Sequence, residues 1–139
     1  MMMQEVINAT DVRKNWSEFI DGVIHSKPSF VRRNHDYLAA LSLEHLQMIL
    51  STYRFNMEYE QEDDGTFSGS LEQIDIVENA KSVDELRVIM AKELVEYARD
   101  YMDNFSMYYH STNRKAHLPY VLAVLAQADL EGVKGLINA

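Results

Sequence analysis

Residues 30–46 read FVRRNHDYLAALSLEHL, and this stretch decides how the first part of the chain folds. Two short apolar runs flank Asn34-His35-Asp36, whose asparagine and aspartate tolerate the backbone of a tight turn. The stretch therefore predicts a β-hairpin with strands over 29–33 and 37–41. Ser42 follows as a candidate N-cap for a helix over 43–50. The inward-facing residues expected on that helix are Leu43, Leu46, Ile49 and Leu50.

Upstream of the hairpin, the sequence predicts a short strand over 5–8 and one amphipathic helix. Thr10 is the expected N-cap, and Asp11 lies in the first turn, where a negative charge is favourable. Ser26-Lys27-Pro28 should end the helix. Its apolar residues recur at helical spacing and predict a single buried stripe of Val12, Trp16, Phe19, Ile20, Val23 and Ile24.

The chain changes character after this β-α-β-β-α segment. Residues 53–60 alternate apolar and polar side chains, as a half-buried strand does. A turn at 62–66 and strands over 67–71 and 74–77 should follow. Ser82 and Glu85 have the spacing of a capping box and predict the start of a long helix. Its expected inner face comprises Val83, Leu86, Met90, Leu94, Tyr97, Ala98, Tyr101 and Met102.

The last third of the chain has a weaker pattern. Residues 106–117 are polar and aromatic, as at a helix end followed by a linker. Pro119 fits the first turn of a helix over 120–127, and a last short helix is expected over 130–137. The fold class is therefore α+β, with two domains over 1–51 and 52–139.

Charge is distributed unevenly between these two segments. The whole chain has a net charge of −9, which argues against nonspecific nucleic-acid binding by the chain as a whole. Residues 1–50 hold five Lys/Arg against six Asp/Glu, whereas residues 51–139 hold eight against sixteen. This difference predicts different partners for the two segments.

Composition excludes several classes of protein. The chain has no cysteine, so disulfides, thiolate zinc sites and cysteine nucleophiles are excluded. The amino terminus lacks a signal-peptide pattern, and no apolar run reaches the roughly 20 residues of a membrane helix. A cytoplasmic protein with no membrane contact is expected. No nucleophile elbow or Gly-rich phosphate loop is present, so the sequence predicts no catalytic residue and no cofactor.

One acidic run allows two interpretations. Its members are Glu58, Glu60, Glu62, Asp63 and Asp64. Clustered carboxylates can bind Mg²⁺ in a nuclease, with Glu58, Glu60 and Asp64 as the candidate ligands. A solvated strand face and the tip of a hairpin account for all five equally well, because metal sites usually gather ligands from several elements.

The basic residues of the first segment suggest a different chemistry. Arginine binds a phosphate or a guanine edge through two hydrogen bonds, and asparagine does the same for adenine. The candidate DNA-binding residues are Arg13, Lys14, Arg32, Arg33 and Asn34. The alternative is that they are ordinary solubilising charges, since the segment has no excess of basic residues.

Two stretches of the first segment resemble the Phd/YefM family of bacterial antitoxins. These are INATDVRKNWSEFID and RRNHDYLAALSLEHLQMIL, both within residues 7–50. The resemblance implies a homodimer, or a higher homo-oligomer, that binds operator DNA and represses its own gene pair. It implies DNA contacts from Arg13 and Arg32, with Lys14, Arg33 and Asn34 as neighbours.

Residues 53–103 resemble the HicB antitoxin domain, which is noncatalytic and binds its toxin. The resemblance implies a β-β-β-α domain, here with extra C-terminal helices, that neutralises a cognate toxin. A basic ribonuclease would suit its acidic charge. The alternative is a dimeric interaction protein that kept the fold without DNA binding. The net charge and Asp36, in a turn where the family often has glycine, favour that alternative.

Overall fold

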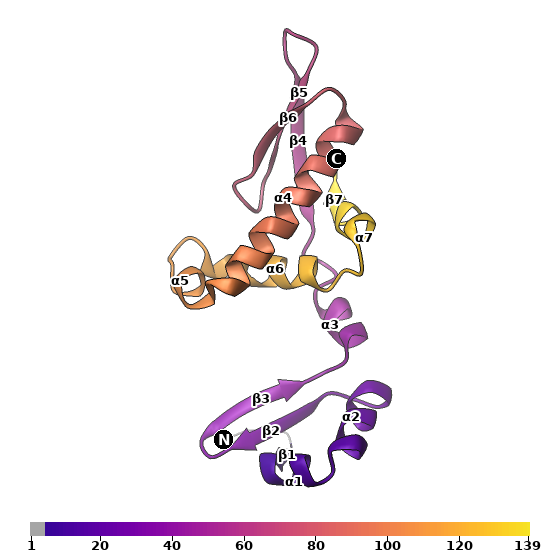
Figure 1. Ribbon diagram of the computed structural model, residues 1–139, viewed down its shortest axis with the longest axis vertical. Helices are drawn as coiled ribbons and strands as arrows, with labels where there is room; N and C mark the ends of the chain where they lie inside the picture. The colour runs from indigo at the N-terminus through magenta and orange to yellow at the C-terminus, as the bar shows by residue number, and fades with distance from the viewer. Residues whose placement is uncertain (1–4) are drawn as a thin grey trace. The chain divides into compact units, whose positions relative to one another are not determined.

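The computed structural model describes residues 5–139, and the chain divides into two compact units, Met1–Ile49 and Leu50–Ala139 (Figure 1). The first unit contains β1 (Val6–Asn8), α1 (Ala9–Lys14), α2 (Trp16–His25), β2 (Ser29–Arg33), β3 (Asp36–Ala40) and α3 (Leu43–Ile49). Its sheet has the order β1-β2-β3, with β1 parallel and β3 antiparallel to the central strand. The predicted β-α-β-β-α order is present, with the first helix in two parts.

The hairpin forms as the sequence indicates, with a tighter turn. Strand β2 has the predicted bounds, and β3 begins at Asp36, one residue earlier than predicted. Only Asn34 and His35 remain in the turn. Arg33 and Asp36 are the cross-strand neighbours that flank it in the backbone pairing of β2 with β3. Asn34 adopts a left-handed φ of 55°, which asparagine accepts more readily than most residues. Asparagine therefore takes the conformation for which glycine would otherwise be needed.

The first helix differs from the prediction at its start and its middle. Asn8, not Thr10, occupies the N-cap position, because the pairing of β1 with β2 ends at Asn8 and the chain turns directly into α1. The helix is then interrupted at Asn15, whose side-chain Nδ2 donates to the carbonyl of Asp11 at 3.2 Å. A side chain that bonds to the carbonyl four residues back competes with regular helix hydrogen bonding. Asn104 has the same kind of bond, since its Nδ2 donates to the carbonyl of Asp100 at 3.2 Å. It separates the helix over 83–103 from the helix over 105–109 in the second unit.

The apolar faces of the first unit are poorly covered within one chain. Ser42 caps α3 as predicted, since its Oγ accepts from the N–H of His45 at 3.1 Å. However, the predicted burial of Leu43 and Ile49 is wrong, because both are exposed. Trp16 and Ile24 of the expected helical stripe are exposed too, and only Val23 of that stripe is buried.

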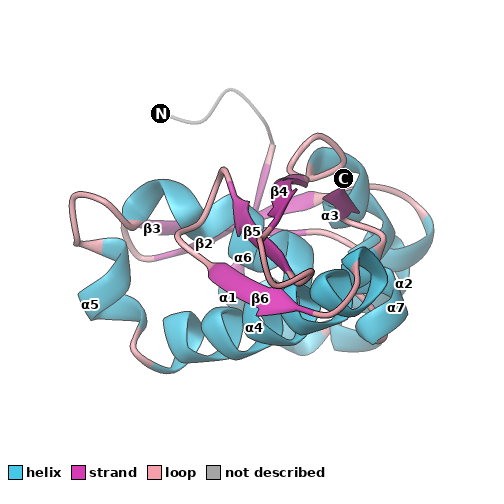
Figure 2. Ribbon diagram, turned by 90° about the horizontal axis from the view of Figure 1, so that it is seen from above, coloured by secondary structure: helices cyan, strands magenta, loops and turns pink. Residues whose placement is uncertain are grey.

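The second unit is a mixed sheet with helices packed on one of its faces. Its elements are β4 (Phe55–Gln61), β5 (Phe67–Leu71), β6 (Val77–Ala80), α4 (Val83–Asp103), α5 (Phe105–Tyr109), a 3₁₀ turn η1 (Lys115–His117), α6 (Leu118–Leu125), α7 (Leu130–Lys134) and β7 (Ile137–Asn138). The strand order is β6-β5-β4-β7, and β7 runs parallel to β4. Helix α4 contacts β5, β6, α6 and α7 (Figure 1 and Figure 2).

The core of this unit is continuous and centres on α4. Five residues of the predicted inner face are buried, and Met102 is exposed. The capping box forms at its start, where Ser82 Oγ accepts from the N–H of Glu85 at 3.1 Å. In return, the N–H of Lys81 donates to Glu85 Oε2 at 3.3 Å. The buried residues of the face are Leu86, Met90, Leu94, Ala98 and Tyr101.

Several elements of the second unit differ from the prediction. Strand β4 spans Phe55–Gln61, whereas a strand was expected over 53–60. Strand β6 begins at Val77 instead of Ile74, because Ile74 and Ile76 belong to a tight connection closed by backbone bonds. Helix α6 begins at Leu118, two residues earlier than predicted. The expected helix over 130–137 ends at Lys134 and is followed by β7. None of the helices within residues 5–139 is both long and apolar enough to cross a membrane.

Candidate nucleic-acid interface

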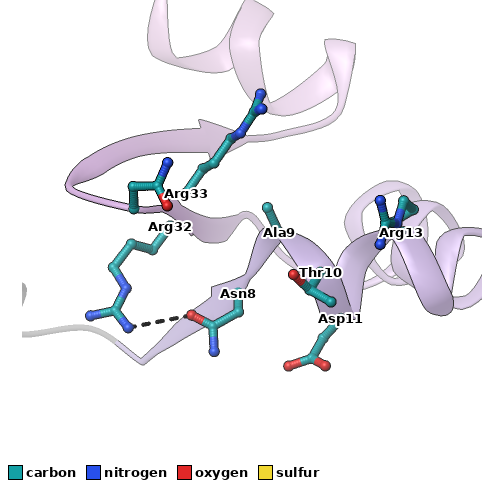
Figure 3. Close-up of a pocket in the computed structure, with 8 residues that line it drawn as sticks. Asn8, Ala9, Thr10, Asp11, Arg13, Arg32 and Arg33 are labelled. Atoms are coloured by element: carbon teal, nitrogen blue, oxygen red, sulfur yellow. Dashed lines mark hydrogen bonds between the residues drawn. The ribbon is translucent and has the colours of Figure 1, made fainter.

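The two hairpin arginines point to opposite sides of the first unit's sheet. Arg32 and Arg33 are consecutive residues of β2, so strand alternation separates their side chains. Figure 3 shows them extending in opposite directions from the strand. Both are exposed. Arg33 therefore does not share the face of the sheet that carries Arg32.

Asn8 holds the side chain of Arg32. The two residues face each other in the pairing of β1 with β2, and Arg32 Nη2 donates to Asn8 Oδ1 at 3.5 Å (Figure 3). Asn8 is the N-cap residue of α1, yet its side chain makes no capping bond and is available to Arg32. Sequence reasoning missed Asn8, because its role depends on the register between two strands far apart in the chain.

One open depression on the first unit gathers most of the predicted basic residues. It has a volume of about 800 Å³. Lys14 does not line it, although it follows Arg13 at the end of α1. Asp11 does line it and adds a negative charge. Of the predicted residues, Arg13, Arg32 and Arg33 line it (Figure 3), and so does Asn34. Asn8 of β1, which was not predicted, lines it as well.

The aspartate of the hairpin lies on the side of Arg33. Cross-strand partners in an antiparallel pair project from the same face of the sheet. Asp36 is the partner of Arg33, and Tyr37 is the partner of Arg32. The carboxylate of Asp36 is therefore directed away from the face that carries Arg32.

The acidic run of the second unit forms a strand face and a hairpin tip. All five carboxylates are exposed. Asp64 accepts from the N–H of Thr66 at 2.9 Å and from its hydroxyl at 2.6 Å, and these bonds hold the pKa of the Asp64 carboxyl below its usual range. Across residues 5–139, no group of three or more His, Asp or Glu is placed to hold a metal ion. Glu58, Glu60 and Asp64 are thus not brought together as a ligand set.

A cluster of tyrosines with His117 was not anticipated from the sequence. The hydroxyl of Tyr97 lies 2.7 Å from Nδ1 of His117, and the hydroxyl of Tyr101 donates to the carbonyl of Arg114 at 2.8 Å. The guanidinium of Arg114 lies 5.4 Å from the centre of the Tyr97 ring. Burial, and secondly the charge of Arg114, hold the pKa of His117 below its ordinary value. These contacts tie the end of α4 to η1, so we regard the cluster as part of the packing.

Two comparisons place the chain among known proteins. A family model named PHD-like, described as "Antitoxin of toxin-antitoxin, RelE / RelB, TA system", matches residues 2–139. A crystal structure from Syntrophomonas wolfei subsp. wolfei, described as an antitoxin part of a proposed toxin/antitoxin system, superimposes with a TM-score of 0.93. It shares 38% sequence identity, and the alignment covers 98% of each chain. No curated protein matches the sequence.

Proposed function

The chain belongs to the PHD-like family of toxin–antitoxin antitoxins, and from this we propose that it binds operator DNA through its first unit and a toxin protein through its second. On this proposal it acts by binding and not by catalysis. The observation that carries the DNA part is that Arg13, Arg32 and Asn34 line one open depression of an otherwise acidic chain, which Arg33 borders from the opposite face of the sheet. The narrower assignment to Phd/YefM, and that of the second unit to HicB, remain proposals.

The chemistry of the depression suits a nucleic acid. Guanidinium groups bind phosphate oxygens or guanine edges through paired hydrogen bonds, and the amide of Asn34 matches adenine. Arg32 Nη2 lies 3.5 Å from Asn8 Oδ1, so this asparagine is a polar neighbour of the arginine in the depression. Asp36 does not oppose this contact, since it lies on the face of Arg33.

A homodimer is the form in which we propose that the chain binds DNA. The first unit exposes many large apolar side chains, and a second copy can cover them. The exposed set comprises Ile7, Trp16, Ile24, Tyr37, Leu38, Leu43, Met48 and Ile49. Two copies would also present two depressions to a palindromic operator.

The second unit is the proposed partner-binding part. Residues 50–139 hold eight Lys/Arg against sixteen Asp/Glu, a net charge of −8. Such a charge speeds the encounter with a basic protein and would oppose nucleic acid. A basic ribonuclease toxin fits this charge, and binding would cover its RNA-binding surface.

A gel shift on the DNA immediately upstream of the gene tests the DNA assignment. The double variant Arg13→Ala/Arg32→Ala should weaken binding by about 100-fold, because each lost arginine contact costs about 1–3 kcal/mol. The matched control is Lys92→Ala/Arg99→Ala, which removes two exposed positive charges from α4 of the second unit. The control should stay within about 3-fold of the wild type. Unchanged affinity in the Arg13/Arg32 variant would contradict the assignment.

One observation favours the alternative of an interaction protein without DNA binding. Asp11 lines the same depression as the arginines and is exposed. A carboxylate at that position repels phosphate. A wild-type protein that fails to shift the upstream DNA but forms a dimer would support this alternative.

A further inference from the structure

The sheet of the second unit has one covered face. Cross-strand pairing places Met57 opposite Leu71, and both are buried. Gly69 lies on the same face two residues before Leu71, and a Cβ added to it would come within 2.7 Å of Leu86 Cδ2 of α4. This face therefore packs directly on α4 and belongs to the core.

The opposite face is open and polar. Cross-strand pairing arranges it in two rows, Glu58-Ser70-Val77 and Glu60-Ser68-Asn79. All residues of these two rows except Asn79 line a shallow depression of about 460 Å³. Val77 is 73% exposed, although valine is normally placed in a strand to be covered. We call the surface formed by Glu58, Glu60, Ser70 and Val77 the acidic face.

At both ends of this sheet face, polar side chains are hydrogen-bonded to one another. At one end, Asn79 Nδ2 donates to Thr66 Oγ1 at 2.9 Å and to Ser68 Oγ at 3.0 Å. At the other, Asn56 Nδ2 donates to Glu72 Oε2 at 3.1 Å and its Oδ1 accepts from Asn138 at 3.3 Å. These bonds fix the polar side chains above and below the acidic face.

The carboxylates between the two networks have no partner. Within residues 5–139, the side chains of Glu58 and Glu60 make no hydrogen bond or ion pair. The guanidinium of Arg54 lies on the neighbouring loop and is already bonded to the Gly135 carbonyl and to Asn138. Both glutamate side chains are thus free to pair with an external group.

The spacing and surroundings of the glutamates indicate what that group is. Alternate residues of a strand lie about 7 Å apart, so each carboxylate can pair with a separate cationic side chain. Within residues 5–139, no group of three or more His, Asp or Glu is placed to hold a metal ion. The exposed Val77 beside them offers an apolar contact, and charged pairs around an apolar contact are typical of protein interfaces. The surrounding charge of −8 favours a basic partner and disfavours a nucleic acid.

We propose that the acidic face is the docking surface for a basic protein, which places arginine or lysine against Glu58 and Glu60 and an apolar side chain against Val77. This inference rests on the proposed function, in which that protein is the toxin. It adds the location of the contact, on the open face of β4, β5 and β6 and not on the helices.

The test measures the affinity between the full-length chain and one purified protein. That protein is the product of the neighbouring gene. Glu58→Lys/Glu60→Lys should weaken binding by about 100-fold, since like charges then meet across the interface. Glu58→Gln/Glu60→Gln keeps the shape and should weaken it by about 10-fold. The control Glu96→Lys/Asp103→Lys makes the same charge change on exposed positions of α4 and should lie within about 3-fold of the wild type.

The outcomes separate this inference from the proposed function. Wild-type binding that both Glu58/Glu60 variants leave unchanged overturns the docking surface and leaves the antitoxin function standing. Absence of wild-type binding contradicts the toxin part of the proposed function, and the docking surface is then wrong as well. Light scattering of the chain alone gives one more readout, because a change of oligomeric state in Glu58→Lys/Glu60→Lys would assign the face to contacts between copies.

Discussion

The two units of the molecule differ in how well each buries its own apolar side chains. The second unit holds a continuous core from Phe55 to Ile137, with α4 at its centre. Among the described residues of the first unit, Val23 and Val31 are the only buried hydrophobic ones. The first unit nevertheless carries more exposed large apolar side chains than the second, in about half as many residues.

This difference indicates that the first unit depends on an external surface. A fully buried large aliphatic side chain contributes about 1.5–3 kcal/mol. Val23 and Val31 supply only two such contributions in the first unit, whereas the second unit has a continuous buried core. We therefore propose that a second copy covers the apolar side chains that the first unit leaves exposed.

The largest expected effect is on the core of the second unit. Leu86 is fully buried, with 0% exposure, against the sheet at Gly69. Leu86→Ala should lower the free energy of unfolding by about 3–4 kcal/mol, because it removes apolar contacts and leaves a cavity. The matched substitution in the first unit is Leu43→Ala, at a position 57% exposed, and should change the stability of the monomer by less than about 1 kcal/mol. Denaturant unfolding at low protein concentration measures both, and similar losses would contradict the comparison.

A smaller effect is expected from adding one charge to the apolar surface of the first unit. Met48 is 77% exposed on α3, and Met48→Glu should raise the dimer dissociation constant by about 10- to 100-fold by burying an unpaired carboxylate. Met107→Glu makes the same change at a position 64% exposed in the second unit and is the control. Analytical ultracentrifugation measures both constants. A monomeric wild type, or a dimer that Met48→Glu leaves intact, would show that this surface is not the dimer contact.

The smallest expected effect is a pH dependence confined to the second unit. Burial holds the pKa of His117 below its ordinary value of 6.5, so the folded state favours the neutral ring. The unfolded chain then binds more protons, and the stability from this group is complete above pH 6.5 and declines as the pH falls through the lower folded pKa. Thermal unfolding between pH 5 and 7 should show this decline in the wild type and a weaker one in His117→Gln.

Local sequence signals predicted the elements that local physics determines. Ser82 and Glu85 marked the start of α4, Ser42 capped α3, and the hairpin turned at Asn34. Strand β7 was missed, because two residues carry no periodic pattern and the strand exists only through its pairing with β4. The burial of α3 was overpredicted for a related reason, since periodicity identifies an apolar face but not whether the same chain covers it.

The candidate site was predictable only where residue type alone indicates the chemistry. Arginine and asparagine at the hairpin pointed to Arg32, Arg33 and Asn34. The contribution of Asn8 depends on the register of β1 against β2, which no local pattern encodes. The face on which Asp36 lies likewise follows from the two-residue turn, because a one-residue shift in pairing would move its carboxylate to the side of Arg32.

We propose that Arg13 and Arg32 of the first unit hold operator DNA while the acidic second unit takes no part in that contact. The most direct measurement is the anisotropy of labelled upstream DNA, titrated with protein at several salt concentrations. The wild type should lose affinity steeply as salt rises, and Arg13→Ala/Arg32→Ala should reduce the slope of log K against log salt by about 2 per protomer. A slope and an affinity that this double variant leaves unchanged would contradict the claim.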